Sequence, residues 1–440
     1  MTSFRFIHAA DIHLDSPLRG LARHDGLPAE AMRLATRQAL AKLVDSAIKH
    51  QVAFMVLAGD LYDGHWKDLS TALFMSDQLR RLSERGISAF IAHGNHDAGS
   101  VINHRLPSIK NVHRFPADKP ATFTLDSLRV ALHGQSFKER HVTDNLAAHY
   151  PPAQLGWLNI GVLHTAMVGR ENGHEPYAPC TLSDLASHGY DYWALGHVHK
   201  AQIVNHPDPW VVYAGVLQGR HARETGDEWT GGNGGWLVSV ESGQISACER
   251  LYCDVLRWRS LECDLTGCAS MEELYERATI ALESVLSKAQ GRHVVARLNF
   301  TGTTTLHNQL HADQDWQQEL RLQARQCSYE GQWLALEKIT LHTHLPSSNT
   351  AKALQPGLAM ALGRLAQDPG QLEQCWELLR PLSKKLQSAG DAIPQLAGLP
   401  TGTPGEMDTI MLEGDFKRLV HEATEELLAQ LAMAGGTAET

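Results

Sequence analysis

Five short polar clusters in the first 200 residues each follow directly after an apolar run of strand length. Their polar side chains are those of Asp11 and His13, of Asp60 and Asp63, of Asn95, His96 and Asp97, of His164, and of His197 and His199. In layered α/β folds the site lies beyond the carboxyl ends of the strands, so this arrangement brings all five clusters to one rim. The order of the clusters therefore predicts an α/β fold with one polar site at the ends of five strands.

The rest of residues 1–250 alternates apolar runs with amphipathic segments, as layered α/β domains do. Strands are predicted at residues 4–10, 52–58, 87–92, 160–163, 192–195, 210–214 and 236–240. Helices are predicted at residues 28–50 and 69–85, where apolar side chains recur at helical spacing.

The chain has 440 residues, which is too long for one ordinary core, so more than one domain is expected. We expect a first domain at 1–250 and a small α/β domain at 251–346, where strands and helices alternate over about 95 residues. Residues 347–440 are expected to form a helical region. An apolar stripe near its end packs either on the protein itself or on a partner, and both alternatives stay open.

The histidine positions, the net charge and the cysteines of the chain indicate which classes of protein to expect. Of the 25 histidines, 19 lie in residues 1–250, where the polar clusters are. The net charge of −10 argues against a chain that holds nucleic acid through its own overall field. The 7 cysteines suggest reduced thiols, and the spacing of Cys248, Cys253, Cys263 and Cys268 is loose for a zinc site. We expect a cytoplasmic protein without a signal peptide or membrane span.

The donor types in the clusters indicate metal chemistry. Carboxylate, imidazole and amide ligands without thiolate suit two borderline divalent ions such as Mn, Fe or Zn. A carboxylate between several histidines is typical of a two-metal hydrolytic site, which clamps a phosphoryl group. Each cluster alone is weak evidence, but all five in this order favour such a site.

Five segments within residues 4–226 carry a family resemblance: HAADIHLDSPL, AGDLYD, HGNHD, GHVH and YAGVLQGRHARETG. They resemble calcineurin-like metallophosphoesterases, and more closely the DNA-repair exonucleases related to SbcD, the nuclease subunit of the SbcCD complex. Within that group the YhaO-like branch is the most similar. The resemblance implies a layered β-sandwich flanked by helices, with a small α/β capping domain and a helical C-terminal tail.

The resemblance also implies two divalent metal ions, with Mn²⁺ as the expected metal. It places the first ion on Asp11, His13, Asp60 and His199, and the second on Asp60, Asn95, His164 and His197, with Asp60 bridging. It places His96 beside the phosphate, where it stabilises charge or protonates the leaving oxygen. Asp97 either orients His96 or acts as a structural cap.

Four further residues are candidates for substrate binding. Archaeal and eukaryotic nucleases of this kind usually have histidine where this chain has Asp63, so the role of Asp63 is open and His65 is a candidate to replace it. Arg220 and Arg223 are candidates for contact with a phosphate backbone. Their alternative is an ion pair with a neighbouring carboxylate such as Glu224.

These expectations point to a two-metal DNA exonuclease of DNA repair, with endonuclease activity also expected, working with an SbcC-like coiled-coil ATPase. One alternative is a small-molecule phosphodiesterase or phosphatase, for instance one acting on cyclic nucleotides. Another is a non-catalytic scaffold that regulates an ATPase. Formation of a homodimer is left open.

Overall fold

The computed structural model describes residues 3–16, 29–63, 69–98, 108–169, 175–226, 232–329 and 331–346. The chain divides into two compact units. The first comprises Met1–Cys263, Arg277–Asn299 and Gln317–Thr340, and the second Asp264–Glu276, Phe300–Trp316 and Leu341–Thr440. The predicted helical region 347–440 lies outside the described residues, and the division at 250 and 346 stays a prediction. Within the described ranges, no helix is long and apolar enough to cross a membrane.

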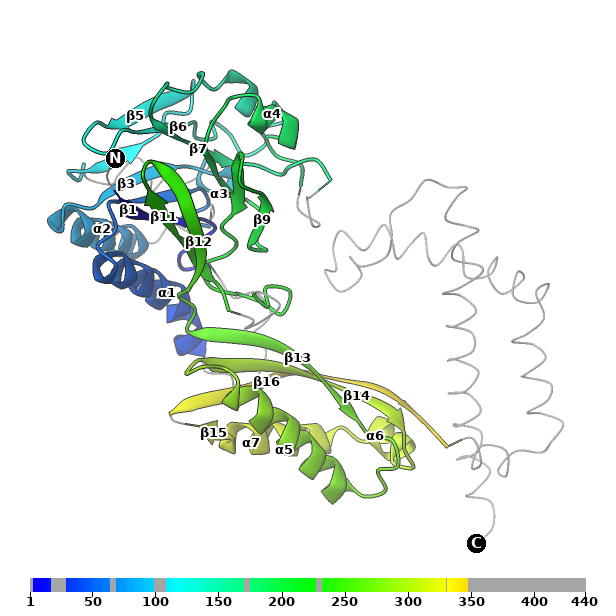
Figure 1. Ribbon diagram of the computed structural model, residues 1–440. Helices are drawn as coiled ribbons and strands as arrows, with labels where there is room; N and C mark the ends of the chain where they lie inside the picture. Colours follow the sequence, from blue (N-terminus) through cyan, green and yellow to red (C-terminus); the bar gives the residue numbers. More distant parts are fainter. Residues whose placement is uncertain are drawn as a thin grey trace, which may run out of the picture. The chain divides into compact units, whose positions relative to one another are not determined.

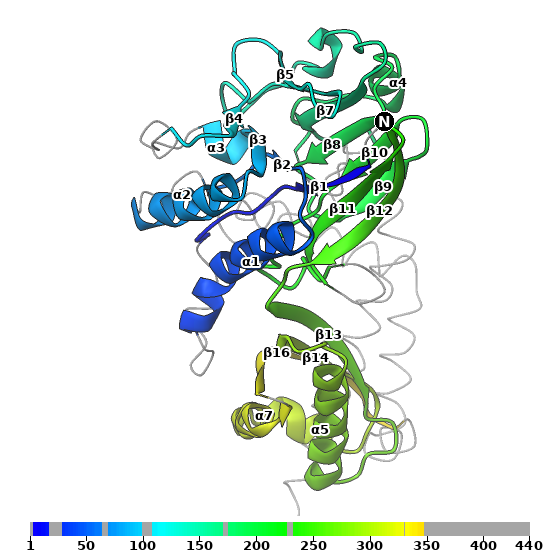
Figure 2. The same ribbon diagram turned by 60° about the vertical axis from the view of Figure 1, so that its left-hand side comes forward.

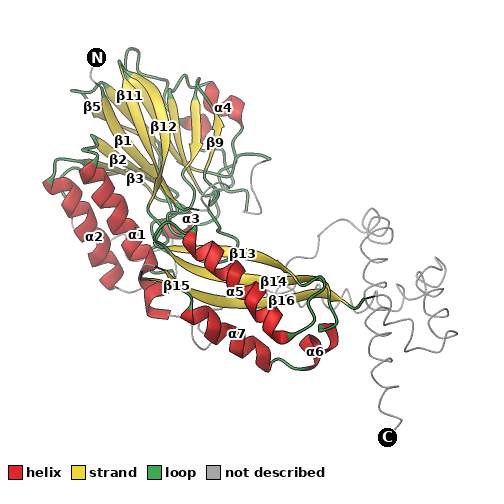
Figure 3. Ribbon diagram, turned by 60° about the horizontal axis from the view of Figure 1, so that its bottom comes forward, coloured by secondary structure: helices red, strands yellow, loops and turns green. Residues whose placement is uncertain are grey.

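The first sheet of the larger unit has the strand order β12-β11-β1-β2-β3-β4. Its strands are β1 (Phe4–Ala9), β2 (Phe54–Ala58), β3 (Ser88–Ala92), β4 (Val112–Arg114), β11 (Gly234–Glu241) and β12 (Gln244–Tyr252). Strands β1 to β4 are parallel, and β11 and β12 extend the sheet in antiparallel pairing. The crossover helices α1 (Ala29–Lys49) and α2 (Leu69–Glu84) lie side by side along this sheet (Figure 1 and Figure 3). Both helices were predicted, within one residue at each end.

The second sheet has the order β5-β6-β7-β8-β10-β9. Its strands are β5 (Ala121–Leu125), β6 (Val130–Gly134), β7 (Leu158–His164), β8 (Tyr192–Gly196), β9 (Gln202–Asn205) and β10 (Trp210–Tyr213). The four inner strands are parallel, and the edge strands β5 and β9 are antiparallel to their neighbours. The short helix α4 (Leu182–Ala186) lies close to β7 and β8 (Figure 2), and its Leu185 packs with Trp193 in the apolar cluster on that side.

The two sheets pack face to face around an aromatic core. The rings of Phe6 and Phe54 stack at 4.9 Å between centroids, and Tyr192 of the second sheet meets Phe6 edge-on at 5.4 Å. Inner strands such as β2 and β7 are buried along their whole length, which explains why they read as continuous apolar runs. The predicted α/β sandwich flanked by helices is therefore confirmed.

A third sheet, most of which belongs to the larger unit, has the order β13-β14-β16-β15. Its strands are β13 (Leu256–Asp264), β14 (His293–Thr303), β15 (Ser328–Tyr329) and β16 (Gln332–His344). The helices between them are α5 (Met271–Ser287), α6 (His307–Ala312) and α7 (Asp315–Gln326). The alternation of strands and helices that the sequence predicts from residue 251 onward is confirmed.

A glycine in the second sheet yields a test of this packing. Gly161 lies opposite Trp193 across the β7–β8 pair, and a Cβ atom there would meet the indole ring at 2.3 Å. Overpacking a full core costs about 1–3 kcal/mol. We therefore expect Gly161→Ala to lower the free energy of unfolding by about that amount in urea denaturation. Adding Trp193→Phe to Gly161→Ala should cost less than the sum of the two single changes, and strict additivity would contradict the contact.

Candidate metal centre

The polar rim is made by sharp turns at the ends of the strands. Four of its residues adopt left-handed backbone: φ is 50° at Asp11, 43° at His13, 53° at Asp60 and 92° at His197. Such conformations are costly for residues other than glycine and cluster at functional sites. Backbone hydrogen bonds tie the first two turns together: the N–H groups of Asp11 and His13 donate to Gly59 and Asp60.

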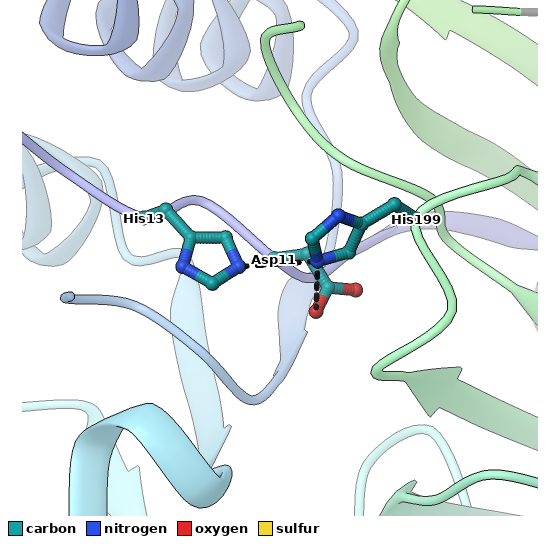
Figure 4. Close-up of side chains that lie close together, drawn as sticks. All are labelled: Asp11, His13 and His199. Carbon is teal, nitrogen blue, oxygen red and sulfur yellow. Dashed lines mark hydrogen bonds and ion pairs between the residues drawn. The ribbon is translucent and has the colours of Figure 1, made fainter. Parts of the chain in front are cut away.

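The first predicted ligand group is assembled around two facing imidazoles. The Nε2 atoms of His13 and His199 lie 3.3 Å apart, and the carboxylate of Asp11 lies beside them, 3.9 Å from Nε2 of His199 (Figure 4). Nε2 of His13 is also 3.8 Å from Oδ2 of Asp60. Asp11, His13, Asp60 and His199 therefore converge on one small volume.

The second predicted group shares Asp60. Oδ2 of Asp60 lies 3.4 Å from Nε2 of His164, and the same nitrogen lies 3.0 Å from Oδ1 of Asn95, the first residue of the short helix α3 (Asn95–Ala98). The ring of His197 is next to that of His164, with 5.1 Å between centroids. Asp60 thus stands between both groups.

Hydrogen bonds fix which nitrogen of three histidines faces a ligand. Nδ1 of His164 donates to the carbonyl of Ala58 at 2.9 Å, and Nε2 of His197 donates to that of Glu175 at 2.9 Å. Nδ1 of His199 donates to Oε1 of Glu224 at 2.8 Å. When such a ring is neutral, this bond leaves its other nitrogen as a lone pair, which is how metal-binding histidines are held.

The donor set fits two divalent cations. Lone pairs of His13 and His199 that face each other at 3.3 Å repel unless a proton or a cation lies between them. Three metal-ligand groups occur among the described residues: Asp11, His13 and His199; His13, Asp60 and His96; and Asp11, Asp60 and His164. None of these groups contains a cysteine, so the described residues do not support a zinc site built from Cys248, Cys253, Cys263 and Cys268.

The protonation of the centre also indicates that it is built for positive charge. Burial raises the pKa of Asp11 to about 6. Burial also acts to raise the pKa of Asp60, but the charges of His164 and His13 outweigh it and hold this pKa well below its ordinary value. Burial acts to lower the pKa of His164, yet Asp60 outweighs it and raises this pKa to about 9. A cation held between these residues would take the place of the proton on His164.

Two glycines make the close approach possible. A Cβ atom at Gly94 would lie 2.4 Å from Oδ1 of Asp60 and 2.8 Å from the ring of His164. A Cβ atom at Gly196 would lie 2.1 Å from the carbonyl of Ala58.

His96 and Asp63 form a pair at the open edge of the centre. The side chain of His96 is 40% exposed, and its ring lies 4.9 Å from that of His13. Its Nδ1 is 3.1 Å from Oδ1 of Asp63, and Ser16 donates to Oδ2 of Asp63 at 2.9 Å. Burial acts to lower the pKa of His96, but the hydrogen bond to Asp63 and the charge of Asp60 outweigh it, so this pKa is raised.

Asp97 has a different role. Its buried carboxylate accepts hydrogen bonds at 3.0 Å from the backbone N–H groups of Leu61, Tyr62 and Gly94. It therefore braces the turns that carry Asp60 and Asn95. Of the two roles considered for Asp97, the structure supports that of a structural cap, and Asp63 holds the place beside His96 that the sequence analysis considered for Asp97.

The two arginines considered for substrate binding, Arg220 and Arg223, differ in their surroundings. Arg220 pairs with Glu224 through its Nη2 at 2.8 Å, which is the alternative to phosphate contact, while Arg223 is exposed. His65 lies outside the described residues. Sequence reasoning named Glu224 only as a partner for these arginines and missed its contact with His199, because one acidic residue 25 positions downstream carries no motif of its own.

Comparison with known proteins identifies the family of this chain. The fold and the facing ligand groups define a metallophosphoesterase. Residues 4–201 match the family described as calcineurin-like phosphoesterase, and residues 258–344 match that described as metallophosphoesterase YhaO, middle domain. The uncharacterized metallophosphoesterase YhaO of Bacillus subtilis (strain 168) is 37% identical over 308 residues, which cover 69% of this chain and 73% of that protein. The chain therefore belongs to the calcineurin-like metallophosphoesterases of the YhaO type.

Two more distant similarities accompany this one. The DNA double-strand break repair protein Mre11 of Methanopyrus kandleri is 28% identical over 214 residues, which cover 44% of this chain and 44% of that protein. A solved dimetal phosphatase from Danio rerio is 11% identical with a TM-score of 0.34, over 54% of this chain and 93% of that one. Similarity to SbcD in particular stays a prediction.

Gly94 provides a test of the centre. Because a methyl group there would displace both Asp60 and His164, we expect Gly94→Ala to weaken binding of divalent metal at least about tenfold without unfolding the protein. Calorimetric titration with Mn²⁺ measures the affinity, and circular dichroism checks the fold. Ala98→Ser, in the same turn, serves as the control. Wild-type affinity in Gly94→Ala would show that these two side chains do not share an ion.

Proposed function

We propose that this metallophosphoesterase is a Mn²⁺-dependent nuclease that hydrolyses phosphodiester bonds of DNA, acting as an exonuclease in DNA repair. The observation that carries the proposal is the position of His96. This imidazole stands half-exposed beside the two ligand groups, held through Nδ1 by Asp63 and close to the ring of His13. With Nδ1 held by Asp63, Nε2 is the nitrogen that would address a substrate phosphate at the half-exposed side of the centre.

The residues of the centre would have separate roles in the reaction. Asp11, His13, Asp60 and His199 would hold one ion, and Asp60, Asn95, His164 and His197 the other. Bound ions would polarise the phosphoryl oxygens and neutralise their charge. His96 would donate a proton from Nε2 to the leaving oxygen, while Asp63 keeps its ring in place and favours its charged form. Asp97 fixes the backbone of the turns between them.

The preference for DNA over a small phosphodiester has two supports. The DNA double-strand break repair protein Mre11 of Methanopyrus kandleri is 28% identical over 44% of each chain. The chain also carries the additional domain at residues 258–344, well beyond the part that matches the phosphoesterase family. A small-molecule phosphodiesterase needs little beyond that first part.

We further propose that the protein works with a large coiled-coil ATPase of the SbcC type, and that it is cytoplasmic. The net charge of −10 gives the chain little affinity of its own for DNA, so the affinity would come from a partner or from a second copy. Residues 347–440 carry 7 basic and 12 acidic side chains and are the candidate docking region.

His96→Ala tests the mechanism. Loss of a positioned proton donor costs about 10²–10⁴-fold in rate. We expect His96→Ala to retain two bound metal ions and to lose at least about a hundredfold in cleavage of end-labelled DNA. Asp63→Asn should reduce turnover by less, because His96 remains but is held less firmly. Unchanged turnover in His96→Ala would refute the assigned role.

A comparison of substrates tests the proposed function. The wild-type protein with Mn²⁺ should degrade single-stranded or duplex DNA at least about tenfold faster than it turns over a cyclic nucleotide, when each is compared as kcat/KM. The His96→Ala variant provides the background for contaminating nucleases. Faster turnover of the cyclic nucleotide would favour the small-molecule phosphodiesterase instead, and turnover of neither would favour the non-catalytic scaffold.

A further inference from the structure

We propose that Glu224 is a positioning residue that holds the metal ligand His199 and the cation Arg220 in one fixed arrangement, so that binding of the ion at His199 depends on this carboxylate. This inference concerns the binding of metal and therefore does not depend on DNA being the substrate.

Glu224 contacts the metal ligand His199 through a buried hydrogen bond. Oε1 of Glu224 accepts from Nδ1 of His199 at 2.8 Å, and the carboxylate is only 3% exposed. This bond leaves Nε2 of His199 as a lone pair that faces Nε2 of His13 at 3.3 Å. A carboxylate behind a histidine in this way fixes the ring, sets its tautomer and makes it a stronger ligand.

Glu224 differs from the acceptors behind the other two oriented histidines. His164 and His197 donate to the backbone carbonyls of Ala58 and Glu175, which no substitution removes. For His199 the acceptor is a side chain. Among the three acceptors that orient these rings, it is therefore the one that a substitution can remove.

The same carboxylate also holds Arg220. The carboxylate of Glu224 accepts from the backbone N–H of Arg220 at 2.7 Å and from its Nη2 at 2.8 Å. Nη1 of Arg220 in turn donates to Oγ of Ser16 at 3.4 Å, and Ser16 donates to Asp63. A continuous path of hydrogen bonds thus runs from the metal ligand His199 through Glu224 and Arg220 to Asp63, the residue beside His96.

The location of Glu224 is itself tightly determined. Its N–H donates to the carbonyl of His221 at 2.9 Å, and its own carbonyl accepts from Asn233 at 3.2 Å. A Cβ atom at Gly219 would lie 2.4 Å from that carbonyl, so the chain packs closely there. The turn from 219 to 224 therefore has little freedom to bring another acceptor to His199.

Removal of the carboxylate has a distinct expected signature. Loss of a carboxylate behind a metal-binding histidine typically weakens metal affinity about 10–100-fold. Glu224→Ala removes both the acceptor for His199 and the charge opposite Arg220. Glu224→Gln keeps an acceptor oxygen but no charge, and Arg220→Met keeps the carboxylate for His199.

Calorimetric titration of the metal-free protein with Mn²⁺, without any substrate, tests the inference. We expect Glu224→Ala to weaken one of two binding events about 10–100-fold and to leave the other within about threefold. Glu224→Gln should show a smaller loss at the same event, and Arg220→Met a smaller loss than Glu224→Ala. The exposed Glu249→Ala serves as the matched control. Thermal unfolding establishes that each variant is folded.

Each possible result of the titrations either supports or overturns the inference. Wild-type affinity at both events in folded Glu224→Ala would overturn the inference. If Glu224→Ala does not fold, wild-type affinity in Glu224→Gln has the same meaning, because that variant preserves the packing. Equal weakening of both events would also overturn it, since the effect would then be a general disturbance. A failure of the protein to cleave DNA would contradict the proposed function and leave this result untouched.

Discussion

The buried carboxylate of Asp60 is the constraint on which the centre depends. Asp60 is 1% exposed, and a charge so far from water is tolerated only with compensation. The compensation comes from two imidazoles, those of His13 and His164, and from the backbone N–H of His96, which donates to Oδ1 at 2.9 Å. The turns that carry these groups are therefore held to positions that satisfy one carboxylate, and the turn that carries His96 requires Gly94 for the approach.

The fold makes this arrangement possible because parallel strands end at the same side of a sheet. Strands β1, β2 and β3 deliver Asp11, Asp60 and Asn95, and β7 and β8 of the facing sheet deliver His164 and His197. The aromatic core of Phe6, Phe54 and Tyr192 fixes the separation of the two sheets. Packing in the core and geometry at the rim are thus linked, since a change in the separation of the sheets would part Asp60 from His164.

Much of this was predictable from the sequence, and for a physical reason. Strands buried on both faces are continuous apolar runs, so β2, β3 and β8 were identified together with the clusters that follow them. The edge strands β5 and β9 were missed because they are half-exposed and mix polar with apolar residues. Within the site, the two ligand groups were predicted from the order of the strands and the family resemblance, whereas the contacts of Asp63 with His96 and of Glu224 with His199 were not.

The many histidines of residues 1–250 are only in part candidate metal ligands. Some of the remaining rings fill structural roles: His8 is buried against Tyr192, and His133 lies between Thr122 and Asn159. Neither the number of histidines nor their burial distinguishes such structural rings from the candidate metal ligands, because both kinds are buried. What separates them is position at a strand end together with a lone pair directed at another donor.

The central claim is that Asp60 bridges two metal ions, and anomalous scattering from a crystal soaked in Mn²⁺ tests it most directly. The account predicts two peaks about 3.5–4 Å apart on opposite sides of the Asp60 carboxylate. One peak should lie against Asp11, His13 and His199, and the other against Asn95, His164 and His197. A single peak, or two peaks that do not share Asp60, would contradict the account.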